Sequence, residues 1–268
     1  MARRRRQNAE QLARSHAVFR APLEARFVAA YRKQLELLRR ASQQETEPFK
    51  ADQWAVRISE SMRPQYQAIM RASGRRYLTQ LAPFVPRKAG TWVRKQGPAG
   101  AGTIVVDLAK SFAAGLAESI LTTWDELSQV VVDAEAGGFL PSQIDDLLGD
   151  VWETIQGPRA EMVGLTATTG AINSVSAYLS SELVELNDWI SAGDPRVRAT
   201  HQTYAAAGSR PAGFNWADLS GGAYTLRFPA DPECTELGEI INCRCFIVPA
   251  AASEPSGLRF DEIASVFT

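Results

Sequence analysis

The side chains best suited to chemistry gather in the last third of the chain. Asp194, His201, Cys234, Cys243 and Cys245 lie between positions 194 and 245, and the whole chain has only 2 histidines and 3 cysteines. Thiolate and imidazole groups are ligands that zinc prefers, so this cluster predicts a structural metal site. The same residue types also fit a nucleophilic cysteine that is activated by a histidine and oriented by an aspartate.

The segment around the histidine is predicted to form a short helix. Asp194 and Pro195 have the residue types of an N-cap and a first helical position. We therefore expect a helix over residues 196 to about 207, closed by Gly208. This helix would carry His201 toward the rest of the cluster.

The segment that carries two of the cysteines has the composition of a strand. Residues 240 to 248 are rich in β-branched and aromatic side chains. Because side chains alternate between the two faces of a strand, Cys243 and Cys245 are expected to face the same side. A disulfide between them is disfavoured, because an extended backbone holds their α-carbons near the upper distance limit for such a bond.

We predict that His201, Cys243 and Cys245 bind zinc, with Cys234 or Asp194 as the fourth ligand. Two thiols side by side have no role in a cysteine hydrolase, which favours the metal site over an enzyme. An alternative interpretation needs no metal. In it the cysteines are small buried apolar residues, the aspartate only caps a helix, and the histidine is a hydrogen-bonded imidazole.

The same region contains an ordered pattern of residues that runs from a tryptophan to the last cysteine. Its distinctive positions are Trp189, Asp194, Arg196, Arg198, His201, Asn242, Cys243, Arg244 and Cys245. Over about residues 159–249, this pattern resembles the phage Mu F-like minor head protein family. The chain departs from the family at Thr166 and Ala167, where members commonly have a Thr-Glu pair. Any role of that glutamate is missing here.

The resemblance implies a non-enzymatic head morphogenesis protein of a tailed phage. Such proteins are present in few copies at the portal vertex and act in head assembly and in DNA packaging or ejection. The implied partners are portal, capsid or scaffold proteins. The implied location is the virion interior near the portal, after assembly in the host cytoplasm. Two other classes of function are open as alternatives, an effector enzyme carried in the virion and a free-standing nucleic-acid-binding protein.

Charge is distributed unevenly along the chain. The first 100 residues contain 21 Lys and Arg against 7 Asp and Glu, whereas the rest contains 8 and 23. The run Arg3, Arg4, Arg5 and Arg6 begins the basic part and predicts contact with packaged DNA, because phosphates are neutralised without regard to base sequence. A solvated helical face would explain the same residues without a ligand.

Apolar residues recur at three- and four-residue spacings up to about position 192, which predicts long amphipathic helices. Pro22 and Pro64 are expected to interrupt two of them, and a long helix is expected from about 159 to 191. Beyond these helices, β-type runs at 224–228 and 240–248 predict strands. We therefore expect a mainly α N-terminal region with a small α+β C-terminal domain. The expected divisions are a basic helical region at 1–90, a Gly/Pro-rich linker or loop at 91–103, a helical region at 104–192 and a small α+β module with its tail at 193–268.

No association with a membrane is expected from the sequence. The longest apolar stretch, 104–124, contains Asp107, Lys110 and Glu118. Polar residues 7–11 do not fit the apolar segment of a signal peptide. An odd number of cysteines in one short region does not fit a secreted disulfide framework either, so we expect a reducing compartment.

Overall fold

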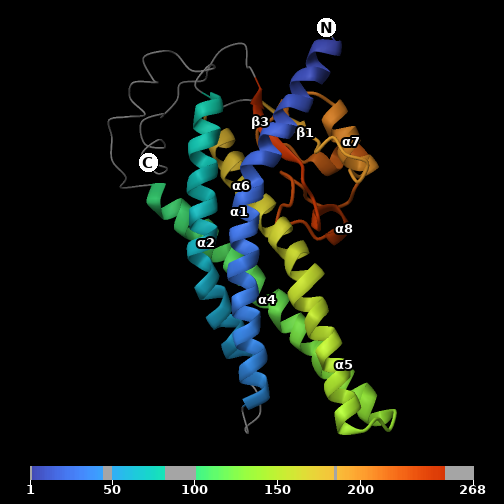
Figure 1. Cartoon of the computed structure of the whole chain (residues 1–268). Coiled ribbons are helices and arrows are strands. Elements are labelled where there is room, and N and C mark those ends of the chain that lie inside the picture. Colours follow the sequence, from blue (N-terminus) through green and yellow to red (C-terminus); the bar gives the residue numbers. More distant parts are fainter. Residues whose placement is uncertain (1, 45–49, 82–100, 184–185, 251–268) are drawn as a thin grey trace.

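A computed structural model of the chain describes residues 2–44, 50–81, 101–183 and 186–250. Long helices dominate it (Figure 1), as the spacing of the apolar residues predicts. A small sheet and short helices follow near the C-terminal end of the described chain. The expected mainly α fold with a small α+β C-terminal domain is confirmed. The long helices are α1 (Ala2–Gln44), α2 (Ala51–Leu81), α4 (Ala101–Ala136), α5 (Pro141–Thr154) and α6 (Ala160–Leu183).

The apolar faces of α1, α2, α4 and α6 pack into one core. In α1, Phe27, Tyr31, Leu35 and Leu38 are buried at successive helical turns, while the charged residues between them face outward. Burial of these stripes is the main force that holds the long helices together. Among the described residues, no helix is both long and apolar enough to cross a bilayer.

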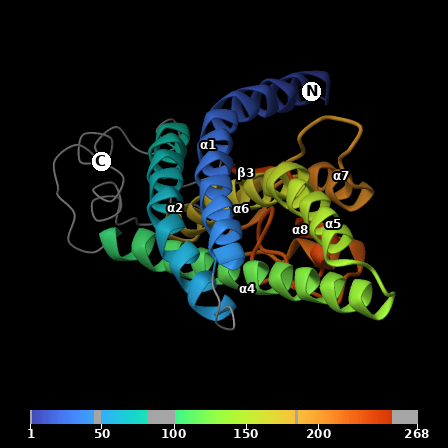
Figure 2. The ribbon, with the colours of Figure 1, turned by 60° about the horizontal axis from the view of Figure 1, so that its bottom comes forward.

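The two prolines do not interrupt their helices, so this expectation is wrong. Pro22 lies within α1 and Pro64 within α2, and both helices continue on either side. Figure 2 shows that α1 bends along its length instead of ending. Packing of the apolar stripe on both sides of each proline offsets the lost backbone hydrogen bond, because tertiary contacts outweigh local propensity over such long helices.

Glycine and proline set the turns that follow α4. Gly138 has a φ of 74° and ends α4, and Pro141 is the first residue of α5. Gly157 breaks the helical geometry within η2 (Ile155–Arg159), the short π-helical segment between α5 and α6. Arg32 of α1 fixes this kink, because its Nε donates to the carbonyl oxygen of Gln156 at 2.6 Å.

The C-terminal module is built on a three-stranded antiparallel sheet with the order β2-β1-β3. Trp189 of the central strand lies opposite Ile247 of β3. The strands are β1 (Leu186–Ile190), β2 (Arg210–Pro211) and β3 (Phe246–Ala250), and the helical segments are α7 (Ala199–Ala206), η3 (Trp216–Ser220) and α8 (Leu237–Ile240).

Three details of this module differ from the predictions. The last long helix ends at Leu183, and β1 follows it before Gly193. Residues 224–228 form no strand, because Leu226 bonds to the loop at Asn215, whose Oδ1 accepts from the Leu226 amide at 2.8 Å. Within 240–248, only the part from Phe246 onward is a strand.

The module is docked on the long helices through buried polar contacts. The Asn173 side chain of α6 donates to the Cys245 carbonyl at 3.1 Å and accepts from the Ile247 amide at 3.1 Å. His16 of α1 stacks on Phe246, with ring centroids 4.0 Å apart. Figure 1 accordingly shows the module beside the N-terminal half of α1, away from the turn between α4 and α5. These contacts hold the start of β3 in a fixed place.

Candidate metal centre

Three of the predicted ligands converge in the centre of the module. The Nδ1 atom of His201, on α7, lies 3.6 Å from Cys243 Sγ and 3.5 Å from Cys245 Sγ. The three ligand atoms all lie within 4.8 Å of one another. Each side chain is at most 2% exposed. This buried group can hold a metal ion.

The two thiols face the same place for a different reason from the one predicted. Neither Cys243 nor Cys245 is in a strand, since both precede β3. The chain turns after α8: Asn242 has a φ of 58°, and the Cys243 amide donates to the Ile240 carbonyl at 3.2 Å. Asparagine tolerates this left-handed conformation better than most residues do. The backbone amide of Asn242 also donates to Thr166 Oγ1 of α6 at 3.0 Å, which ties the turn to the long helices.

The prediction that Asp194 is the N-cap of the helix that carries His201 is wrong. Helix α7 begins only at Ala199, with Arg198 at its N-cap. Asp194 instead stabilises the preceding turn, where its Oδ1 accepts from the Arg196 amide at 2.9 Å. Its carboxylate also forms a two-point ion pair with Arg244, at 2.5 and 2.8 Å. This pair links the loop before α7 to the cysteine turn, and it leaves the aspartate outside the ligand group.

Cys234 is likewise outside the group that converges. It is buried in the same apolar cluster as the other two cysteines, but its Sγ donates to the Glu236 carbonyl at 3.7 Å. Burial raises the pKa of the Cys234 thiol. The structure therefore brings together three of the four ligands that were predicted.

Glu239 belongs to the site, although sequence reasoning gave it no role. Its Oε2 lies 2.9 Å from His201 Nε2, on the side of the ring that faces away from the sulfurs. This contact is short but is not aligned as a hydrogen bond. Thr200 Oγ1 donates to both carboxylate oxygens, at 3.1 and 3.0 Å. A carboxylate behind a ligand imidazole is a frequent outer partner in metal sites, because it fixes the ring orientation and tautomer.

The two sulfurs differ in their electrostatics. A hydrogen bond with Cys243 lowers the pKa of Cys245 well below its ordinary value, and His201 and the Ala192 amide lower it further. The same interaction with Cys245, together with burial, raises the pKa of Cys243. All three cysteines are free thiols. The pair therefore favours one thiolate beside the imidazole, which is the ligand form that metals require.

Aromatic side chains close the site from solvent. Trp189 of β1 meets the His201 ring edge-on at 5.1 Å, and it meets Tyr204 in the same way at 5.1 Å. The ring centroids of Trp216 and Trp189 are 5.4 Å apart. Trp189, Tyr204 and Trp216 are buried with the two cysteines, which are 1% and 2% exposed.

The remaining arginines of the motif surround the turn that carries the cysteines. Arg198 Nη2 donates to the Ile241 carbonyl at 2.5 Å. Arg196 is exposed. The predicted DNA contacts Arg3, Arg4, Arg5 and Arg6 lie in α1, but their side chains are outside the described residues.

The comparisons with known proteins add no relative. No family model matches the sequence, and no match was found among curated proteins or among solved structures.

Proposed function

We propose that His201, Cys243 and Cys245 bind a zinc ion that serves a structural role. Zinc bonds of about 2.3 Å to sulfur and about 2.05 Å to nitrogen, at a tetrahedral angle, place the two atoms about 3.6 Å apart. The observed separations between nitrogen and sulfur are 3.5 and 3.6 Å. Both sulfurs approach the same nitrogen, which has a single lone pair or proton and satisfies only one linear hydrogen bond with a thiol. A shared ion accounts for both contacts.

Burial supports a structural site over a catalytic one. A nucleophilic cysteine must reach its substrate, whereas Cys243 and Cys245 are 1% and 2% exposed. The donor set joins α7 to a turn more than 40 residues later in the chain, since the bonded pairs are 42 and 44 residues apart. An ion held there cross-links two segments of a module that has a modest core of its own.

Removal of single ligands tests the zinc proposal. Cys243→Ser and Cys245→Ser are expected to abolish binding of zinc, while Cys234→Ser retains it, because its sulfur stands outside the converging group. Metal content is measured by elemental analysis of the purified full-length protein. Equal loss of zinc in all three variants would instead make Cys234 an indispensable ligand.

We further propose that the chain is a minor head protein of a tailed phage that acts at the portal vertex during head assembly. The observation that supports this proposal is that the distinctive positions of the family contact one another in the structure. Trp189 packs on His201, and Asp194 pairs with Arg244. Arg198 bonds to the cysteine turn beside the two ligand sulfurs. Residues from both halves of the motif thus form one connected unit, as expected if the resemblance reflects a common module.

Mass spectrometry of purified particles tests this second proposal. Peptides of this chain are expected in virions, in far fewer copies than the capsid protein, and a gene deletion is expected to give defective heads. Co-purification with the portal protein is the corresponding result in solution. Absence of the chain from particles, with normal heads after deletion, would refute the proposal while leaving the zinc site untouched.

A further inference from the structure

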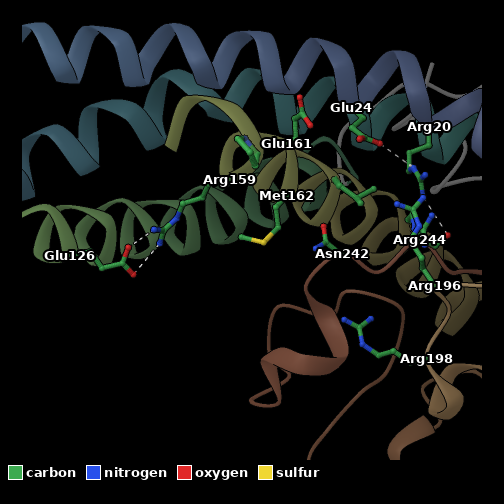
Figure 3. A pocket seen from close by; sticks show the side chains of 12 residues that line it. Arg20, Glu24, Glu126, Arg159, Glu161, Met162, Arg196, Arg198, Asn242 and Arg244 are labelled. Atoms are coloured by element: carbon green, nitrogen blue, oxygen red, sulfur yellow. Dashed lines mark hydrogen bonds and ion pairs between the residues drawn. The ribbon is translucent and has the colours of Figure 1, made fainter. Parts of the chain in front are cut away.

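An open groove runs between the long helices and the C-terminal module. Its volume is about 1110 Å³, and its walls come from α1, from α4, from the start of α6 and from the segments that flank the metal centre. Figure 3 shows side chains from all these segments directed toward it. Five arginines line it: Arg20, Arg159, Arg196, Arg198 and Arg244.

Most of the acidic groups near the groove are already neutralised. Glu24 pairs with Arg20 at 3.3 Å, and Glu126 pairs with Arg159. Glu161 is directed to Arg32 of α1, with an ion pair of 2.9 Å. These pairs leave the positive charge of the groove concentrated at the end near the metal centre.

Arg196 and Arg198 supply positive charge that has no counterion among the described residues. Neither guanidinium has a carboxylate partner within the part of the chain that the structure describes, and Arg198 is held only by the Ile241 carbonyl. The exposed Asn242 also lines the groove, and Figure 3 shows it between Arg198 and the long helices. Two guanidinium groups and an amide donor therefore line the groove on the side of the C-terminal module.

Arg20 and Arg244 add a close pair of like charges at the same end. Arg20 Nη1 donates to the Arg244 carbonyl at 3.4 Å, and each side chain is only about an eighth exposed. Burial lowers the pKa of Arg20; the charge of Arg244 lowers it further, and Glu24 opposes the change. Glu24 pairs with Arg20 and Asp194 pairs with Arg244, so both of these guanidiniums already have a carboxylate partner.

The size and lining of the groove favour a polymer over a small molecule. Its volume exceeds the roughly 300–1,000 Å³ of typical small-ligand pockets, and it is open to solvent. No aromatic side chain of the described ranges lines it, so these residues offer no platform on which unpaired bases could stack. Guanidinium groups match phosphate oxygens in a two-point geometry. These features fit the backbone of a duplex.

We propose that this groove binds the phosphate backbone of double-stranded nucleic acid through Arg196, Arg198 and Asn242, without regard to base sequence. The site is separate from the run at residues 3–6, and the inference holds whether or not the chain is part of a phage particle. Binding of nucleic acid in the groove does not involve His201, Cys243 or Cys245.

Fluorescence anisotropy with a labelled DNA duplex of about 20 base pairs tests the proposal on the full-length protein. Arg196→Glu is the test variant, because its exposed side chain makes no contact on which the fold depends. Arg71→Glu, an exposed arginine of α2 outside the groove, is the matched control. We expect Arg196→Glu to weaken binding about tenfold at about 50 mM salt and to reduce the salt slope by about 1, with less than a twofold change for the control.

Further titrations separate the possible ligands. Inorganic phosphate and a polyglutamate peptide are added as competitors against the duplex, and each is expected to compete weakly. Equal loss of affinity in Arg196→Glu and Arg71→Glu would overturn the proposal, since binding would then follow net charge alone. Tighter binding of the acidic peptide than of DNA would overturn it in favour of an acidic protein partner, and saturable binding of phosphate without any binding of DNA would overturn it in favour of a free anion.

Discussion

Replacement of His16 by phenylalanine is expected to remove a pH dependence of folding stability. His16 is 4% exposed and stacks on Phe246, so the imidazole is buried where α1 meets β3. Burial lowers its pKa from 6.5 to about 3, and the charges of Arg20 and Arg76 contribute to the shift. Between pH 6.5 and about 3, His16 is therefore protonated in the unfolded chain but neutral in the folded protein.

The sign and size of the effect follow from linkage. Between pH 6.5 and about 3, the unfolded chain binds a proton that the folded protein does not, so stability falls as the pH falls through this window. The loss is about 1.4 kcal/mol for each pH unit below 6.5, or about 2 kcal/mol at pH 5. At pH 7 the histidine is mostly neutral in both states, and the penalty falls to about 0.2 kcal/mol.

Urea unfolding of the wild type and of His16→Phe at pH 7 and pH 5 measures this directly. The phenylalanine keeps a ring on Phe246 but has no proton to bind, so the difference in unfolding free energy between the two proteins should shift by about 2 kcal/mol between the two pH values. All other titrating groups are common to both proteins and cancel. The same difference at both pH values would show that the imidazole is accessible in the folded state, and would refute the docking of α1 on β3.

Other variants probe the metal centre and its attachment. Cys245→Ser is expected to make the C-terminal module sensitive to limited proteolysis while far-ultraviolet circular dichroism retains the signal of the upstream helices; a protease-resistant module would count against a structural ion. Asn173→Ala should lower the unfolding free energy by about 3 kcal/mol, because it leaves a buried carbonyl and a buried amide without partners; an unchanged midpoint in urea would contradict this. Gly170→Ala should lower the unfolding free energy by about 1–3 kcal/mol, as measured by thermal unfolding, because a Cβ there would lie 2.8 Å from the Ala230 carbonyl oxygen and 2.8 Å from Phe112. A stability equal to that of the wild type would show that Gly170 of α6 is not in close contact with Ala230 and Phe112.

The helical part of the fold could be predicted from local patterns. Spacing of apolar residues identified the long helices. The prediction was wrong at Pro22 and Pro64. A proline inside a helix removes a backbone hydrogen bond, but packing between the long helices offsets this loss, and the sequence does not show that packing. Strand β1 was missed because its five residues follow an apolar helix with only two residues between them.

The candidate site was predictable from residue types but not from geometry. His201, Cys243 and Cys245 could be predicted as ligands because the chain has few histidines and cysteines and most of them lie close together in the sequence. Their ligand atoms do converge in the structure. The expected strand alternation was wrong, because the left-handed Asn242 creates a turn that no periodicity reveals. The role of Glu239 depends on which side of the imidazole faces the sulfurs, and this can be read only in three dimensions.

The groove lined by arginines could not be predicted from the sequence either. Arg20, Arg159 and Arg196 belong to α1, to the kink before α6 and to the loop before α7, so nothing local relates them. The sequence did display the excess of basic residues in the first 100 positions. It did not indicate that Arg196 and Arg198, in the acidic half, have no carboxylate partner within the part of the chain that the structure describes.

The central claim is that an ion joins α7 to the cysteine turn, and the zinc content of the purified full-length protein tests it most directly. Native mass spectrometry combined with elemental analysis should find one zinc ion per chain, and removal of that ion by a chelator should render the C-terminal module sensitive to protease. A fully folded, protease-resistant protein that holds no zinc and takes up none on titration would contradict the claim.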